Sequence, residues 1–224
     1  VKFYKACRGA GIKPIGAADV WIGNPNAPDK PFRAMLIIRN DAGYLRLSEL
    51  LTAAYVGKDR NIHHAELNPE WLENGDNSGL ICLSGAHYGE VGVNLLNGNE
   101  DAARAAALRY AAWFPDAFYL ELQRLPERPE WEACVSGSVK LAEELGLPVV
   151  ATHPTQFMSS DDFNAHEARV CIAGGWVLTD KKRPRDFTPS QFFIPPETMA
   201  ERFADLPEAL ENTVEIAKRC NLHI

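Results

Sequence analysis

The stretch "DAFYLELQRLPERPEWEACVSGSVKLAEELGLPVVATH", Asp116 to His153, indicates the fold more clearly than any other part of the sequence. "DAFYLEL" predicts a buried strand, "EWEACVSGSVKLAEELG" predicts a helix that ends at Gly146, and "PVVATH" predicts a second buried strand. Two strands that are joined through a helix usually run parallel in one sheet. The stretch therefore predicts a βαβ unit.

The same alternation continues on both sides of this unit. Strands are expected at residues 12–22, 32–38 and 80–86, and helices at residues 1–11, 41–57, 69–75, 89–98, 99–114, 161–175, 195–205 and 208–220. We expect Asp41 to cap the helix of residues 41–57 and Gly57 to end it. Residues 58–69 are expected to be irregular. Repeated strand–helix units favour a parallel α/β fold, either a barrel or a doubly wound sheet.

The composition excludes several classes of protein. Of the 224 residues, 46% are hydrophobic and 24% charged, which is ordinary for a soluble globular domain. The net charge of −7 argues against a main nucleic-acid surface, which would carry a basic stripe. The five cysteines are widely spaced and form no C-x-x-C pair, so we expect reduced, mostly buried thiols. The sequence has no apolar run long enough to cross a bilayer, and we expect a cytoplasmic protein.

The first residues, "VKFYKACRGAG", have the spacing of the middle of an α-helix. Proteins rarely begin in this way. We therefore expect a piece of a longer chain, with at least one strand before it.

The ends of the predicted strands are the natural place to look for a catalytic or metal site. They carry Asp19, Arg33, Ala86, Glu121 and His153. A cation such as Arg33 would repel a divalent ion and could occupy its space, and Asp19 and Glu121 are better explained as ion-pair partners. A working metal site is therefore not expected, and no phosphate loop or nucleophile elbow is present either.

The other histidines give no stronger indication. His63 and His64 are expected in a solvated loop, and His87 follows a strand but has no carboxylate or cysteine beside it. His166 and Glu167 begin an H-E-x-x-H pattern, which fails at Val170. We expect His166 to make a structural hydrogen bond.

Several long motifs carry a resemblance to a known family. They are "VKFYKACRGAGIKPIGAADV", "DAGYLRLSELL", "LICLSGAHYGEV", "PVVATHPTQF", "DDFNAHEARVCIA" and "FADLPEALENTVEIAKRCNL". In this order they resemble the PHP (polymerase and histidinol phosphatase) domain of bacterial replicative DNA polymerase III alpha subunits, mostly the proteobacterial type. The resemblance covers the chain from Val1 to Ile224. It implies a distorted (β/α)₇ TIM-like barrel whose first strands are missing, in one PHP domain fragment of residues 1–224 with a helical C-terminal part at about 159–224.

The resemblance also implies that the metal site of the family has degenerated. Asp19 stands where the family has a ligand glutamate, Arg33 where it has a histidine and Ala86 where it has a cysteine. In the family's N-D-x-H segment, Pro154 takes the place of the ligand Asp and Gln156 that of the ligand His.

His153 takes the place of the non-ligand Asn in that segment. The family's first ligands lie in an H-x-H segment and a following strand, both of which precede this chain. No metal cofactor is therefore expected.

The implied function is non-catalytic, within a parent that is a DNA-directed DNA polymerase (a nucleotidyltransferase) of DNA replication. The expected partners are the remainder of the alpha subunit and the proofreading exonuclease subunit, epsilon, and DNA is expected to be contacted mainly by other domains. One alternative is a metal-dependent phosphoesterase or pyrophosphatase, as in active PHP relatives. A second is a stand-alone α/β binding protein unrelated to replication.

Overall fold

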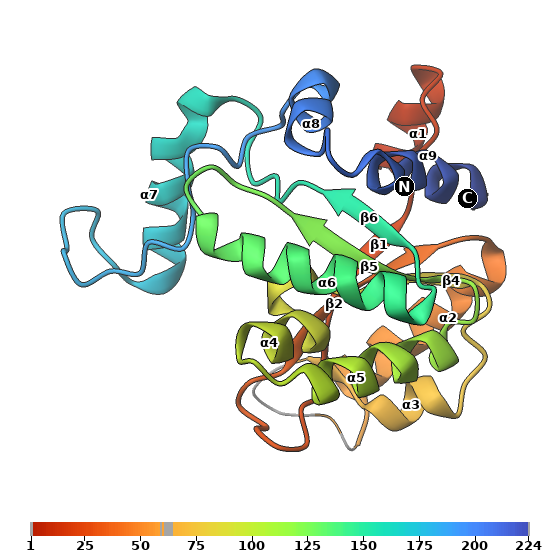
Figure 1. Cartoon of the computed structure of the whole chain (residues 1–224). Helices are drawn as coiled ribbons and strands as arrows, with labels where there is room; N and C mark the ends of the chain where they lie inside the picture. The colour runs from red at the N-terminus through yellow and green to blue at the C-terminus, as the bar shows by residue number, and fades with distance from the viewer. Residues whose placement is uncertain (1, 59, 61–64, 224) are drawn as a thin grey trace.

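The computed structural model forms the predicted βαβ unit in full (Figure 1). It describes residues 2–58, 60 and 65–223. β5 (Phe118–Gln123) and β6 (Val149–Thr152) are joined through α6 (Glu132–Leu145) and pair in parallel. Gly146 ends α6 as predicted, with a φ of +65° that suits a residue without a Cβ. The residues of β5 are all buried, including the polar Glu121 and Gln123.

The sheet formed by the described residues has six strands in the order β3-β1-β2-β4-β5-β6. The other four strands are β1 (Ala17–Ile22), β2 (Phe32–Ile38), β3 (Glu66–Leu67) and β4 (Leu80–Leu83). β2 runs antiparallel to both β1 and β4, so the prediction of parallel pairing is wrong for this strand. The remaining neighbours pair in parallel.

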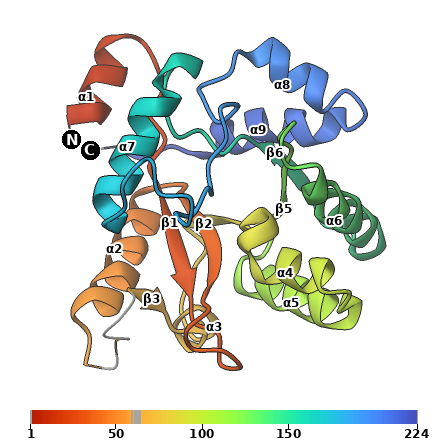
Figure 2. The same cartoon turned by 90° about the vertical axis from the view of Figure 1, so that its left-hand side faces the viewer.

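The α/β class is therefore confirmed, whereas the distorted (β/α)₇ barrel with its first strands missing is not. β3 and β6 stand at the two edges of the sheet, and within the part of the chain that the structure describes these two edges do not pair with each other. The sheet is open in this sense, with helices around it (Figure 2).

The helices follow the predicted segments closely. They are α1 (Lys2–Gly9), α2 (Asp41–Val56), α3 (Pro69–Glu73), η1 (Ala86–Tyr88), α4 (Glu90–Leu96), α5 (Glu100–Trp113), η2 (Pro129–Trp131), η3 (Ser160–Asp162), α7 (Phe163–Gly174), α8 (Pro196–Arg202) and α9 (Pro207–Arg219). α2 packs on β2 and β3, α6 on β5 and α9 on β6. α1 lies beside α9, where the Tyr4 hydroxyl donates to the Leu222 carbonyl, so the two ends of the chain are neighbours.

Three local predictions need correction. The N-cap of α2 is Asn40 and not Asp41, because the Asn40 side chain accepts a hydrogen bond from the Gly43 N–H. β1 begins five residues later than predicted, at Ala17, and β3 lies in a segment that was expected to be irregular. Gly57 follows α2 and ends it as predicted.

The interior and the surface agree with the composition. The cysteines are all free, and Cys82, Cys134, Cys171 and Cys220 are buried as expected. None of the helices formed by the described residues combines the length and the apolar character that a bilayer crossing requires.

Candidate functional site

A cavity of about 670 Å³ lies where β4, β5 and β6 end. β1 runs in the same direction as these strands, so its second half reaches the same edge of the sheet, and β2 begins there. Strands, the turn after β4 and two loops contribute the walls. The lining residues are Asp19, Val20, Trp21, Arg33, His87, Tyr88, Gln123, Trp131, Pro154, Gln156, Asp186, Phe187 and Gln191. Four of the five site residues named from the sequence therefore face one cavity, and the fifth, Ala86, is buried beside it in η1.

An ion pair crosses from β1 to β2 at the cavity wall. Arg33 donates to Oδ1 of Asp19 through Nε at 3.1 Å and through Nη2 at 2.8 Å. Arg33 stands opposite Trp21 in the β1–β2 register, two residues from Asp19, so the pair is a diagonal one. The expectation that Asp19 is an ion-pair partner is confirmed.

Glu121 of β5 lies beneath the cavity and is bonded differently from the prediction. Its carboxyl group accepts hydrogen bonds from the Gly85 N–H, the Gln123 amide and the Thr152 hydroxyl, at 3.1, 3.0 and 2.5 Å. Among the described residues Glu121 makes no ion pair, so that expectation is wrong. Burial raises the pKa of Glu121, although the Thr152 hydroxyl, the Arg33 guanidinium and the Gln123 amide oppose the shift.

His87 forms an aromatic wall of the cavity. Its ring stacks on the indole of Trp131, with ring centroids 3.6 Å apart and planes 23° apart. Burial, and then the Arg33 and Arg128 guanidinium groups, lower the pKa of His87 to about 4. The imidazole is therefore neutral near pH 7, and neither of its buried ring nitrogens has a hydrogen-bond partner within the described chain.

The loop after β6 places Pro154 and Gln156 in the cavity wall and His153 outside it. Gln191 holds this loop, because its side-chain amide donates to the Pro154 carbonyl and its own carbonyl accepts from the Gln156 N–H. His153 instead lies between the Phe192 carbonyl, at 2.9 Å from Nε2, and the Arg202 guanidinium, at 3.3 Å from Nδ1. The Phe192 contact implies that Nε2 carries the proton, so His153 is a structural residue here.

The sequence model of the PHP domain family matches residues 1–125 of this chain. The chain belongs to the PHP domain family. The DNA polymerase III subunit alpha of Neisseria meningitidis serogroup A is 97% identical over 224 residues, which is 100% of this chain and 20% of that protein. The same subunit of Escherichia coli K12 is 44% identical and that of Pseudomonas aeruginosa 43%, each over 100% of this chain and 19% of the relative. The chain thus spans about a fifth of the length of these curated relatives.

The cavity side chains of this PHP domain do not fit a divalent metal ion. Among the described residues, no three His, Cys, Asp or Glu side chains gather into a metal-binding group. Asp19 is the one carboxylate of β1 and β2 in the wall, and the Arg33 cation already neutralises it. His63 and His64 lie outside the described residues.

Several lining residues were missed by sequence reasoning. Gln123 stands two residues after Glu121 on β5, and the alternation of strand side chains could have placed both at one face. Trp131, Phe187 and Gln191 come from loops and η2, and no sequence motif marks them.

Proposed function

We propose that this chain is a non-catalytic PHP domain of a DNA polymerase III alpha subunit, a DNA-directed DNA polymerase of DNA replication. In this proposal the domain braces the remainder of the alpha subunit and docks the proofreading exonuclease subunit, epsilon, in the cytoplasm. The family membership and the identity of the relatives over the whole chain support it.

The observation that carries the non-catalytic role is the Arg33–Asp19 ion pair. We propose that Asp19, Arg33, Ala86, Pro154 and Gln156 are the former metal-ligand positions of the family. The guanidinium of Arg33 supplies the positive charge beside Asp19, where an active relative would need a metal ion. Ala86 and Pro154 have no side-chain donor atom, and Gln156 offers only a neutral amide.

The proposal treats residues 1–224 as one PHP domain fragment, whose C-terminal part at about 159–224 is helical. α9 supports this extent, since it packs on β6 and the Asn212 amide donates to the Val149 carbonyl at 2.8 Å. We further propose that strands outside this chain complete a TIM-like barrel, and that other domains make the main contacts with DNA.

The test uses the full-length polypeptide that contains this chain. We expect elemental analysis of the purified polypeptide to find substoichiometric zinc, manganese and iron, and we expect the exonuclease subunit to bind in isothermal titration calorimetry. Failure of the wild-type polypeptide to bind the exonuclease would refute the docking role.

The phosphoesterase or pyrophosphatase alternative predicts the opposite result for metal content. It requires stoichiometric metal and hydrolysis of pyrophosphate or p-nitrophenyl phosphate, both lost in Asp19→Asn. Leu108→Asp, on the exposed face of α5, is the matched control for a surface change without effect on the cavity. Metal-dependent hydrolysis that survives in the control and disappears in Asp19→Asn would replace our proposal with this one.

A further inference from the structure

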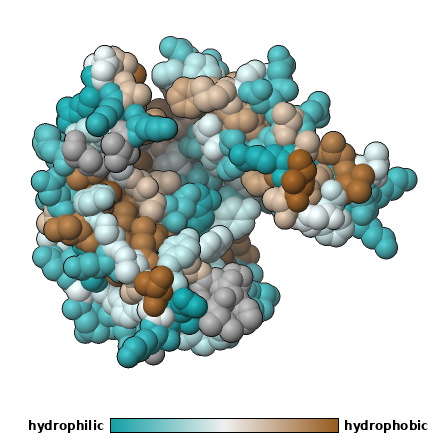
Figure 3. Space-filling model, turned by 180° about the vertical axis from the view of Figure 1, so that it is seen from behind, coloured by the Kyte–Doolittle hydropathy of each residue, from teal (hydrophilic) through white to brown (hydrophobic). Residues whose placement is uncertain are grey.

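Residues 172–187, here called the arm, project from the rest of the domain (Figures 1 and 3). The arm comprises the last turn of α7 and the loop after it. Four large apolar side chains of this short segment are exposed, Ile172 at 83%, Val177 at 67%, Leu178 at 47% and Trp176 at 39%. Apolar residues gather on this projection in Figure 3, with hydrophilic residues around them. Such a patch marks an interaction site more often than isolated exposed residues do.

The end of α7 gives the arm a defined shape. Gly175 takes a φ of +69° and reverses the chain, and the Trp176 N–H returns to the Cys171 carbonyl at 2.8 Å. The indole of Trp176 then lies against Gly174, where a Cβ would come within 2.7 Å of its Cδ1. The following residues, Val177 and Leu178, are consequently held outward.

A buried ion pair fastens the arm to α7. Nη1 of Arg183 lies 2.5 Å from Oε2 of Glu167, and the two side chains are only 7% and 6% exposed. Nε of Arg183 also donates to the Leu178 carbonyl at 3.2 Å, which ties the apolar tip to the same anchor. The base of the arm is held from the other side, because Arg128 donates to the carbonyls of Arg185 and Asp186. An arm fixed in this way loses little conformational entropy when it binds.

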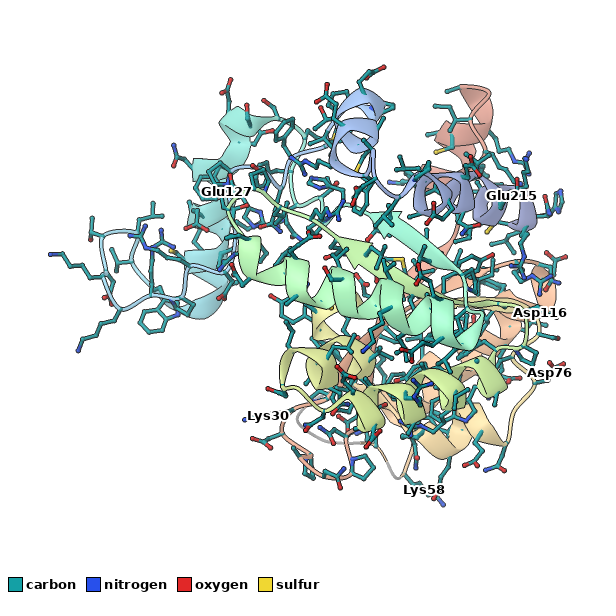
Figure 4. The ribbon with its side chains drawn as sticks, in the orientation of Figure 1. Lys30, Lys58, Asp76, Asp116, Glu127 and Glu215 are labelled. Carbon is teal, nitrogen blue, oxygen red and sulfur yellow. The ribbon has the colours of Figure 1, made fainter. Side chains whose placement is uncertain are left out.

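The neighbouring segment is also tied down. The Ser190 hydroxyl donates to Glu127 at 2.6 Å, and Figure 4 shows Glu127 on the loop between β5 and η2, beside the chain that follows α7. The arm is thus supported at its base and free at its tip.

The charge around the apolar tip is opposite to that of the whole chain. Lys181, Lys182 and Arg185 are exposed and outnumber the one exposed carboxylate of the arm, Asp186 at its base, whereas the chain carries a net charge of −7. The Asp180 carboxylate accepts the Lys182 N–H within the turn, so this anion has a local role. A binding partner would therefore meet apolar side chains bordered by cations.

We propose that the arm is a docking surface for a protein segment that presents apolar side chains bordered by carboxylates. The inference rests on the proposed function, in which this partner belongs to the exonuclease subunit. Three of the four apolar side chains are aliphatic and offer no stacking platform for bases, which disfavours nucleic acid. A contact between two copies of the arm would place two surfaces that are both rich in exposed cations against each other, which disfavours self-association.

The test compares four full-length polypeptides in calorimetric titrations with the exonuclease subunit. They are the wild type, Val177→Asp with Leu178→Asp, Lys181→Glu with Lys182→Glu, and the control Leu108→Asp on α5. We expect each arm variant to bind about tenfold or more weakly, as is usual when central contacts are lost, and the control to bind as the wild type. Added salt should weaken the wild type more than the Lys181→Glu, Lys182→Glu variant.

Other outcomes would overturn the inference. If the wild type binds the exonuclease and both arm variants bind equally well, the arm is not the docking surface, while the proposed function stands. If the wild type itself does not bind, the proposed function fails as well. Loss of binding to a single-stranded oligonucleotide in the lysine variant alone would assign the arm to nucleic acid, and a wild-type dimer that the variants abolish in sedimentation would assign it to a second copy. Thermal melts of all four proteins identify any variant that fails to fold.

Discussion

The cavity at the strand ends and the arm after α7 differ in which side chains are paired and which are left exposed. In the cavity, Arg33 pairs with Asp19 and three neutral donors bind the Glu121 carboxyl group, although the ring nitrogens of His87 have no partner within the described chain. In the arm, the ion pair of Arg183 and Glu167 is buried while the aliphatic side chains stand in water. Charged groups that are already paired gain little from a ligand, whereas exposed apolar surface gains from being covered. The comparison supports the proposal that the domain acts through its outer surface and not through the cavity.

The largest effect is expected from breaking the anchor of the arm. Arg183→Met leaves the Glu167 carboxylate buried without its partner, so we expect a loss of about 3–5 kcal/mol in the free energy of unfolding or local unfolding of the arm. Urea denaturation measures the free energy of unfolding, and hydrogen exchange of residues 175–187 measures local unfolding of the arm. The double variant Glu167→Met, Arg183→Met should recover most of the loss, and a double variant as unstable as the single one would contradict the explanation.

A slightly smaller effect is expected at Gly85, which turns the chain from β4 into the cavity. A Cβ there would lie 2.1 Å from the Arg33 carbonyl, and φ is +79°. We expect Gly85→Ala to cost about 3 kcal/mol, from overpacking together with the left-handed backbone. Gly98→Ala is the matched control, since Gly98 has a φ of +73° but open space around it. Equal losses in thermal melts of the two variants would show that the contact with Arg33 is unimportant.

Removing the acceptor beneath the cavity should have an intermediate effect. Glu121→Leu deprives the Gly85 N–H, the Gln123 amide and the Thr152 hydroxyl of their shared partner. We expect a cost of about 1–3 kcal/mol, because buried donors are left unsatisfied. Unfolding in urea measures this cost, and an unchanged free energy of unfolding would mean that water enters and replaces the carboxyl group.

The same residue predicts a pH dependence. The pKa of Glu121 is raised in the folded state, so between the ordinary and the raised pKa the folded chain holds a proton that the unfolded chain has released. This contribution to stability is present at low pH and is lost as the pH rises through the folded pKa. Urea midpoints of the wild type should therefore fall across that window relative to those of Glu121→Gln, and parallel profiles would disprove the shift.

The smallest effect is expected at the ion pair itself. Asp19 is 53% exposed and Arg33 is 27% exposed, so Arg33→Met should change the free energy of unfolding by only about 0.5 kcal/mol. It should nevertheless raise the pKa of His87 above its value of about 4, because the Arg33 charge contributes to lowering it. An NMR titration of the imidazole measures this, and an unchanged pKa would mean that burial alone sets it.

The fold was predictable wherever residue type and period agreed. "FRAMLII" became β2 with the expected limits, and Gly146 ended α6. The antiparallel β2 was missed, although the nine residues that join β1 to β2 are too few for a parallel crossover, and their number could have shown it. β3 could not be predicted, because a strand of two residues is too short to show an alternation of apolar and polar side chains. The N-cap of α2 could not be assigned either, because Asn40 and Asp41 are equally good caps by residue type.

The residues of the site were predictable where they lie at or directly after the ends of strands. Asp19, Arg33, Pro154 and Gln156 came together because strand direction brings those ends to one edge. The bonding of Glu121 was not predictable, since its three donors come from separate segments of the chain. The arm was missed as well, because an exposed Val177 and Leu178 look like ordinary apolar residues until their surroundings are known.

The salt bridge between β1 and β2 has one further consequence. A dissociable ion leaves its site when the supply in the cell falls or a chelator competes for it. The positive charge beside Asp19 is instead encoded in the polypeptide and is made whenever the chain is made. Under the proposed function, a replication protein that carries this ion pair would therefore keep the charge balance of the site through metal starvation.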